Sequence, residues 1–316
     1  RCLHSHQFIT NGHTDSWYMS TRIRAYVDLL RLHFFFAWPV LFCSGFLLAA
    51  TVYGTYTTLD LVRAALIGFF GFEAGFVLND YVDCEYDRRD IEADRLTRYW
   101  RIFGTRPLPA GLIPPRNALV LFGILSASAA LLIISLPFPN SIFVLAIMAA
   151  SYGLEVFYQL RKRDQALPLA QLAGRVDFAL FPVAGYLCIG SPDLTALLYF
   201  LFFYPFAEAH LAVNDMIDVK NDRARGMETV TTLYGMRGSV AWISGFLAIH
   251  LVMALLFMTV LGWIARAGIT AGLLLLASAL AVLSRRPDPD SCMKALPLFH
   301  GVMLLYSVSI ILDSVL

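Results

Sequence analysis

The chain has 316 residues, of which 58% are hydrophobic and 15% are charged, and its mean hydropathy is +0.65. This composition excludes a soluble globular protein and is typical of an integral membrane protein. The formal net charge of +1 argues against nucleic acid as a partner. The five cysteines include no C-x-x-C pair, so neither a zinc site nor a disulfide framework is suggested.

Residues 1–18 are polar, so the sequence predicts a disordered tail or an expression remnant before a single transmembrane domain over residues 19–316. Nine apolar runs recur in that domain, and each reaches the roughly 20 residues that cross a bilayer once its flanks are included. Arg175, Asp177 and Pro182 interrupt the fifth run. The nine expected helices are centred on Phe34–Val52, Leu61–Leu78, Ala118–Leu136, Ile142–Phe157, Leu169–Ile189, Leu194–Val213, Val240–Leu261, Ile269–Leu283 and Ala295–Leu312.

The basic residues test this topology independently. If the chain crosses the membrane nine times, all but two of its 24 Lys and Arg residues fall on the side of the N-terminal segment. The two exceptions are Arg63 and Arg266. By the positive-inside rule, the basic side is cytoplasmic. The sequence therefore predicts an all-α, multi-pass protein of the cell membrane with its C-terminus outside.

The first expected helix begins near Arg31, which is either a topological anchor or a clamp for an anionic substrate. The second helix carries Glu73 at membrane depth, where an ionisable residue should face the protein interior or a wet cavity. This helix ends in an acidic motif, Asn79-Asp80-Tyr81-Val82-Asp83-Cys84-Glu85-Tyr86-Asp87-Arg88.

The sixth expected helix repeats both features. Glu208 lies at the same distance before a second motif, Asn214-Asp215-Met216-Ile217-Asp218-Val219-Lys220-Asn221-Asp222-Arg223, and both motifs read N-D-x-x-D-x-x-x-D-R. Two matching motifs in the same orientation predict a parallel internal repeat, with helices one to four matching helices five to eight. The repeats would cover about residues 25–163 and 164–286, with a ninth helix over residues 291–316.

The spacing within each motif indicates a chemistry. Positions i, i+3 and i+7 lie on one face of a helix, so each motif presents three carboxylates and an amide as one stripe. Carboxylates gathered in this way repel each other unless divalent cations neutralise them, and oxygen ligands favour Mg²⁺. Protein-bound Mg²⁺ usually keeps positions open for phosphate oxygens, which predicts a diphosphate ligand. A single motif of this kind could instead be a solvated helix end.

The loops that follow the two motifs lie on the cytoplasmic side. Residues 88–116 include an expected amphipathic interfacial helix within Ile91–Phe103, and residues 220–237 occupy the matching place after the second motif. We expect the two loops to form a lid over a shared site. At the end of the fourth helix, Tyr158 and Lys162 are one turn apart, and Lys162 is either a phosphate ligand or a topological anchor.

Together, these features resemble the UbiA superfamily of intramembrane prenyltransferases. The resemblance covers nearly the whole chain and is carried by the first acidic motif, by Asp218 and Asp222, by the Y-x-x-x-K pair Tyr158 and Lys162, and by the nine helices. It implies two Mg²⁺ ions that hold a polyprenyl diphosphate, such as geranylgeranyl diphosphate. It also implies transfer of the prenyl group to a lipophilic acceptor, either an aromatic quinone precursor or a glycerol-phosphate lipid.

The resemblance implies roles for individual residues. The implied metal ligands are Asn79, Asp80, Asp83, Asp87, Asp215, Asp218 and Asp222. The implied substrate-binding residues are Asn79, Arg31, Arg88, Arg106, Tyr158, Lys162 and Asn214. The implied catalytic residues are Asp83, Asp87, Asp218, Asp222 and Lys162. Glu73 and Glu208 join the catalytic candidates because of their depth: as facing carboxylates they would share a proton or hold the acceptor, and otherwise they only fix packing.

Other functions remain open at this point. Relatives of the same fold that cyclise the prenyl chain or hydrolyse the diphosphate are one alternative, and a cation-coupled transporter is another. Transporters carry their charges near the bilayer midplane, whereas both acidic motifs here are expected at one membrane surface. The surplus of basic residues in the loop over residues 88–116 favours a phosphorylated lipid acceptor. No obligate protein partner is evident.

Overall fold

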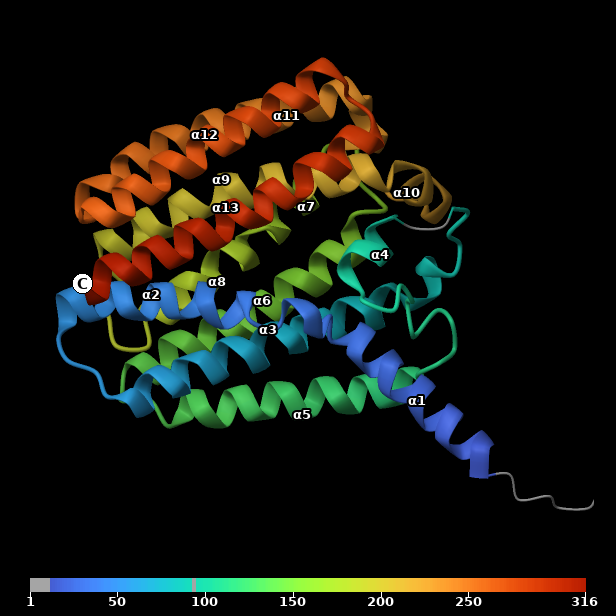
Figure 1. Ribbon diagram of the computed structural model, residues 1–316, viewed down its shortest axis with the longest axis horizontal. Helices are drawn as coiled ribbons and strands as arrows, with labels where there is room; N and C mark the ends of the chain where they lie inside the picture. The colour runs from blue at the N-terminus through green and yellow to red at the C-terminus, as the bar shows by residue number, and fades with distance from the viewer. Residues whose placement is uncertain (1–11, 93–94) are drawn as a thin grey trace, which may run out of the picture.

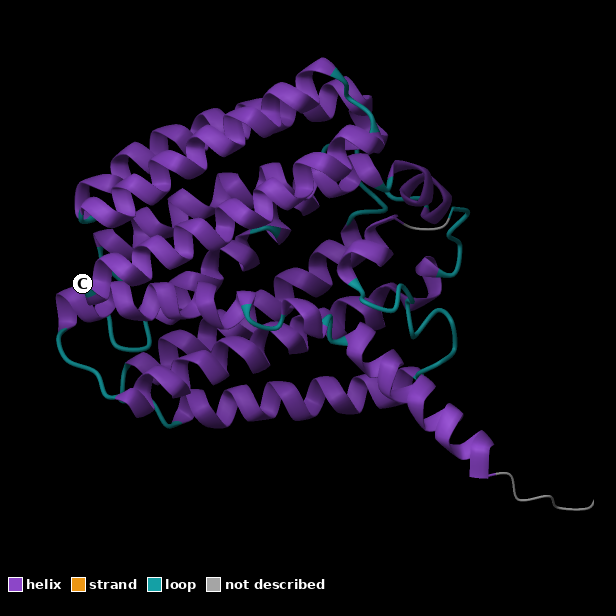
Figure 2. Cartoon of the chain, viewed as in Figure 1, coloured by secondary structure: helices purple, strands orange, loops and turns teal. Residues whose placement is uncertain are grey.

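The expected all-α architecture is confirmed. The computed structural model describes residues 12–92 and 95–316, and within these ranges it contains helices and loops but no strand (Figure 2). The first helix, α1 (Gly12–Leu29), takes in residues 12–18 of the expected tail, so this part of the tail is helical. Residues 1–11 of that tail lie outside the described residues.

Two groups of helices follow α1 along the chain. The first group consists of η1 (Leu32–Phe34), α2 (Ala37–Tyr53), α3 (Thr58–Asp87), α4 (Arg95–Trp100), α5 (Pro115–Ile134) and α6 (Asn140–Arg161). The second group consists of α7 (Leu169–Gly174), α8 (Val176–Tyr186), α9 (Leu194–Ile217), α10 (Val219–Arg225), α11 (Val230–Phe257), η2 (Met258–Val260), α12 (Trp263–Arg285) and α13 (Pro289–Val315).

Eight segments of the described chain are helical, long and apolar enough to cross a membrane. The fifth expected span, Leu169–Ile189, differs because it consists of two short helices, α7 and α8, which meet at Arg175. Neither piece alone has the length of a bilayer-spanning helix. The protein is thus a multi-pass membrane protein, while the count of nine crossings and the internal repeat stay predictions.

The long helices run side by side in one bundle (Figure 1). The backbones of α2 and α8 approach each other closely. A Cβ atom placed on Gly45 would lie 1.9 Å from the carbonyl oxygen of Pro182, and one on Gly185 would lie 1.9 Å from that of Phe42. Small residues allow such close packing of membrane helices, where dispersion contacts drive association. These two glycines therefore fix α2 against α8.

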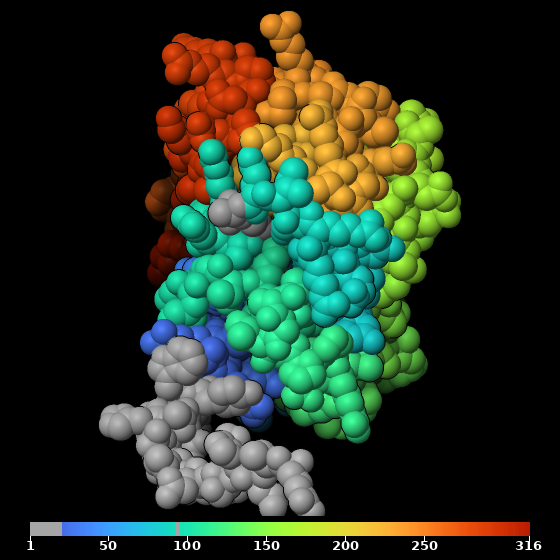
Figure 3. All heavy atoms as spheres, turned by 90° about the vertical axis from the view of Figure 1, so that its right-hand side faces the viewer, coloured from blue at the N-terminus to red at the C-terminus, as the bar shows by residue number. Residues whose placement is uncertain are grey.

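Both acidic motifs lie at the same end of the bundle, because α3 ends at Asp87 and α9 ends at Ile217 (Figure 1, right). Figure 3 looks onto this end, where the segment between α3 and α5 covers the middle of the face. Within the interfacial helix expected inside Ile91–Phe103, the structure has the shorter α4. The bundle thus presents both motifs and the loops that follow them on one surface.

Candidate active site

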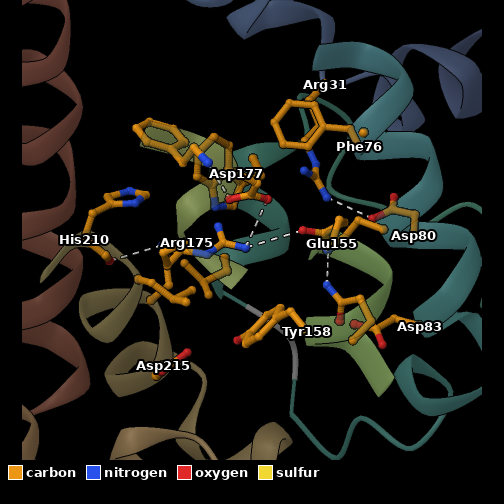
Figure 4. Close-up of a pocket in the computed structure, with 18 of the residues that line it drawn as sticks. Arg31, Phe76, Asp80, Asp83, Glu155, Tyr158, Arg175, Asp177, His210 and Asp215 are labelled. Atoms are coloured by element: carbon orange, nitrogen blue, oxygen red, sulfur yellow. Dashed lines mark hydrogen bonds and ion pairs between the residues drawn. The ribbon is translucent and has the colours of Figure 1, made fainter. Parts of the chain in front are cut away.

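A cavity of about 320 Å³ opens between α3, α6, α8, α9 and α13 (Figure 4). Among the described residues, eight carboxylates and six basic side chains line it. Its polar end contains the side chains of both acidic motifs. The other end is apolar and is lined mainly by Trp38, Phe72, Phe76, Phe178, Phe181 and Phe206.

The first carboxylate of the α3 motif is held by two arginines. Asp80 accepts hydrogen bonds from Arg31 at 2.8 Å and from Arg101 at 2.7 Å. Burial lowers the pKa of the Arg31 guanidinium to about 10 and Asp80 opposes this shift, so Arg31 remains charged at neutral pH. Its guanidinium carbon also lies 3.9 Å from the ring centroid of Phe76. Arg31 therefore spans the acidic and the aromatic parts of the cavity.

The next two carboxylates of the motif also have basic partners. Asp83 accepts hydrogen bonds from Lys162 at 2.7 Å and from Arg163 at 2.6 Å, both at the end of α6. Asp87 forms an ion pair with Arg106 at 2.7 Å. These basic side chains neutralise carboxylates that would otherwise repel each other.

Tyr158, the other half of the Y-x-x-x-K pair, is buried one turn before Lys162. Its ring packs against the backbone of α7, where a Cβ atom on Gly174 would lie 2.8 Å from that of Tyr158. The Lys162 Nζ atom lies 5.1 Å from the centre of this ring. Because Gly174 has no side chain, the Tyr158 ring can pack against α7 while it lies close to Lys162.

In the second motif, Asp218 accepts hydrogen bonds from Asn221 at 2.8 Å and from Arg225 at 3.0 Å. Burial, and then the carboxylates of Asp215 and Asp218, raise the pKa of Asp222 well above its ordinary value. The carboxyl groups of the second motif therefore lie close together in a buried place. A bound cation would stabilise their charged forms.

The loops after the two motifs are joined to each other. The backbone nitrogens of Ile91 and Glu92 both donate to Asn221 Oδ1 at 3.1 Å. Arg225 bonds to Asp90 through two nitrogens, at 2.6 and 2.7 Å, and lies 3.4 Å from Asp87 of the other motif. Arg225 therefore connects the two motifs directly.

Three of the residues expected in the site do not line the cavity. Arg88 is half-exposed and forms a surface ion pair with Glu85. The carboxylate oxygens of Glu73 and Glu208 are buried and form no hydrogen bond among the described residues. Glu73 interacts electrostatically with Arg31, whereas Glu208 interacts with Arg175, so the two glutamates are not each other's partners. The other expected residues line the cavity: Arg31, Asn79, Asp80, Asp83, Asp87, Arg106, Tyr158, Lys162, Asn214, Asp215, Asp218 and Asp222.

The sequence analysis missed a second charged cluster in the cavity, formed by Glu155, Arg175 and Asp177 (Figure 4). Arg175 Nη2 lies 3.4 Å from Glu155 Oε2 and 3.8 Å from Asp177 Oδ2. Glu155 Oε1 accepts a hydrogen bond of 2.6 Å from Asn79 of the first motif. A signal for this cluster was present, because charged residues that interrupt an apolar span usually face an interior cavity.

Two histidines at the cavity wall were also missed. His210 and His300 lie 2.9 Å apart between their Nε2 atoms, and the Nδ1 atom of His300 bonds to the Tyr99 hydroxyl at 2.6 Å. Isolated histidines in apolar helices give no signal in the sequence, because most of them are structural. Arg101 and Arg225 were missed for a similar reason, since basic loop residues are the default on this side.

The fit of a metal ion to these residues is uneven. Among the described residues, no three His, Cys, Asp or Glu side chains gather closely enough to hold one. However, Asn214 Oδ1 and Asp215 Oδ2 are buried at the cavity without a hydrogen-bond partner. Unmet oxygen acceptors of this kind suit Mg²⁺ or its bound water. The donor set therefore fits Mg²⁺, provided that the aspartates of the first motif turn away from their basic partners.

Two known proteins are similar to this chain in sequence. The chain is 25% identical over 280 residues to a 4-hydroxybenzoate octaprenyltransferase of Tolumonas auensis, covering 84% of this chain and 90% of that protein. It is 29% identical over 232 residues to a digeranylgeranylglyceryl phosphate synthase of Pyrococcus horikoshii, covering 72% of this chain and 75% of that protein.

A solved structure shares the fold. It is that of a UbiA homolog from Archaeoglobus fulgidus bound to DMAPP and Mg²⁺, with a TM-score of 0.66 and 16% sequence identity over 92% of this chain and 99% of that chain. Residues 36–308 match the UbiA prenyltransferase family, which is most of the chain. The protein described here therefore belongs to the UbiA prenyltransferase family.

Proposed function

We propose that this prenyltransferase moves the prenyl group of a polyprenyl diphosphate, such as geranylgeranyl diphosphate, to a lipophilic acceptor, and that the reaction requires Mg²⁺. The observation that carries the proposal is the single cavity, which joins the carboxylates of both motifs and several basic residues to an aromatic compartment. A donor with a polyanionic head and an apolar tail matches both ends of this cavity.

Two Mg²⁺ ions would be held by the motif residues Asn79, Asp80, Asp83, Asp87, Asp215, Asp218 and Asp222. When bound, they supply positive charge that stabilises the departing diphosphate. The unpartnered oxygens of Asn214 and Asp215 support such binding, as do the carboxylates of Asp215 and Asp218 beside Asp222.

The basic residues lie beside the carboxylates that would hold the metal ions, because Asp83 pairs with Lys162 and Asp87 with Arg106. With Mg²⁺ held by these carboxylates, Lys162, Arg106 and Arg31 would bind the oxygens of the diphosphate. Charge-assisted hydrogen bonds from these residues strengthen as negative charge develops on the leaving group.

The aromatic compartment holds the prenyl chain and shelters its reactive carbon. The rings of Trp38 and Phe72 are stacked, with centroids 3.7 Å apart, and Phe76 packs against both. Their faces stabilise positive charge at the allylic carbon, and the surrounding apolar walls exclude water. The bond between C1 and the diphosphate oxygen breaks and its electron pair leaves with the diphosphate. The nucleophilic atom of the acceptor then bonds to C1, and its proton passes to the diphosphate.

The distribution of basic residues supports a site at the cytoplasmic face of the membrane, with the C-terminus outside. A polyprenyl donor and a lipophilic acceptor would both enter from the bilayer. Neither step needs a protein nucleophile or a protein partner.

The test uses the purified protein in lipid nanodiscs with radiolabelled geranylgeranyl diphosphate, Mg²⁺ and a panel of acceptors. We expect a prenylated product, with no product in EDTA and recovery when Mg²⁺ is added back. The matched variants are Asp83→Asn in the cavity and Asp164→Asn on the surface, since the Asp164 side chain is 86% exposed. Diphosphate release without a prenylated acceptor would contradict the proposal and indicate a cyclase or a diphosphatase.

A further inference from the structure

The cluster of Glu155, Arg175 and Asp177 lies next to the proposed donor site but outside the two motifs. Asn79 connects the two, because its side-chain amide donates to Glu155 at 2.6 Å. Asn79 precedes Asp83 by one helical turn, and Glu155 precedes Lys162 by two turns, so the cluster lies deeper in the bundle than the pair of Asp83 and Lys162. It occupies the level where the acidic part of the cavity meets the aromatic rings.

One arginine serves two carboxylates in this cluster. The same Nη2 atom of Arg175 lies 3.4 Å from Glu155 and 3.8 Å from Asp177. Gln159 and Asn79 satisfy one oxygen of Glu155 with neutral amide donors. The cluster thus has two carboxyl groups but one guanidinium to balance their charge, and Asp177 Oδ2 lies beyond hydrogen-bond distance of that guanidinium.

The neighbouring basic residues do not compensate for this charge. Arg101 is bonded to Asp80, and Arg106 is bonded to Asp87. The basic residues of the loop over residues 88–116 had favoured a phosphorylated acceptor. These ion pairs show that the first motif largely neutralises them. When the donor binds, these residues turn to its diphosphate under the function proposed above. Few positive charges then remain for a second anion.

We propose that the Glu155–Arg175–Asp177 cluster binds the reacting end of the acceptor, and that this end is an uncharged group bearing a hydroxyl. The proposal rests on the prenyl-transfer function. The hydroxyl donates a hydrogen bond to Asp177, beside the aromatic rings that hold the allylic carbon. A carboxylate or phosphate at the same place meets two carboxylates that already share one guanidinium, and like charges brought together in this way oppose binding.

The experiment compares matched acceptors that differ in charge. With geranylgeranyl diphosphate and Mg²⁺, the purified protein in nanodiscs receives 4-hydroxybenzoate or its methyl ester, and geranylgeranylglyceryl phosphate or geranylgeranylglycerol. We expect the uncharged member of at least one pair to be prenylated with a kcat/KM at least about tenfold higher than its anionic counterpart. An equal or higher kcat/KM for the anionic member in both pairs would overturn the inference and leave the proposed function intact. Absence of transfer to all four acceptors would overturn both.

A variant ties the preference to the cluster. Asp177→Asn keeps the shape of the side chain and removes one negative charge, so it should reduce the preference for the uncharged acceptor by about fivefold or more while the KM for the donor stays within about twofold. The surface variant Asp164→Asn should keep the preference of the wild type. If Asp177→Asn lowers the rate with all acceptors equally, the residue is structural and the assignment is wrong.

Discussion

Asp83 offers a test of whether the motif carboxylates alternate between basic side chains and metal ions. Its carboxylate bonds to Lys162 at 2.7 Å and to Arg163 at 2.6 Å, and the three side chains are only 7%, 6% and 11% exposed. Asp83→Ala leaves two buried cations side by side without their acid. Removal of one partner of a buried pair typically costs about 3–5 kcal/mol, and the slight exposure of these side chains favours the lower end, about 3 kcal/mol.

A second substitution separates stability from activity. The double variant Asp83→Ala/Lys162→Met also removes the charge of Lys162, which is less exposed than Arg163. We therefore expect it to recover about half of the stability that Asp83→Ala loses. Turnover should stay at least about 100-fold below wild type in both variants, because the groups that stabilise the leaving diphosphate are missing. Thermal unfolding in one detergent at one scan rate measures the change in stability. Release of radiolabelled diphosphate measures the turnover. If the double variant is no more stable than Asp83→Ala, the ion-pair reasoning is refuted. Wild-type turnover in Asp83→Ala would refute the metal role.

Three further outcomes follow from the same structure. Arg31→Ala or Lys162→Ala should raise the donor KM or lower kcat at least about tenfold, with the acceptor KM unchanged, and unaltered donor kinetics would make both residues topological anchors. Glu73→Gln and Glu208→Gln should bind the prenyl diphosphate normally but slow its transfer, as measured by donor titration and product formation, and wild-type rates in both would make the two glutamates packing elements. Gly45→Ala should lower the apparent unfolding midpoint markedly, because the added methyl group collides with the Pro182 carbonyl, and an unchanged midpoint would show that α2 and α8 can separate.

The sequence predicted the donor end of the cavity well, because its residues repeat as a motif. Carboxylates spaced three and four residues apart lie on one face of a helix. Asp80, Asp83 and Asp87 were therefore expected on one face, and they are found on one face of α3. Their partners could not be predicted in the same way. Arg101 meets Asp80, and Arg225 meets Asp87, only through the folding of the segments that follow the two motifs, and a single basic residue on the cytoplasmic side looks like any other.

The inner end of the cavity, where we propose that the acceptor binds, was predicted less well, for a different reason. The apolar run over Leu169–Ile189 indicated one spanning helix, but Arg175 marks the point where α7 passes into α8. Periodicity does not reveal such a break, because both pieces remain helical and mostly apolar. The depth of Glu73 and Glu208 was inferred from helical rise alone, which gives the level of a side chain but not the direction in which it points.

The close backbone contacts of Gly45 with Pro182 and of Gly185 with Phe42 have a consequence for how the sequence of this protein can change. They join α2, which follows Arg31, to α8, which begins just after Arg175, so one rigid joint sets the spacing between the leaving-group site and the inner cluster. Side chains such as Asp177 extend from this joint without forming part of it. We expect that substitutions of such side chains can change which acceptor is used, while the distances within the proposed diphosphate site stay the same. A lineage can thus acquire new products by exchanging a few inner side chains, as long as both glycines are retained.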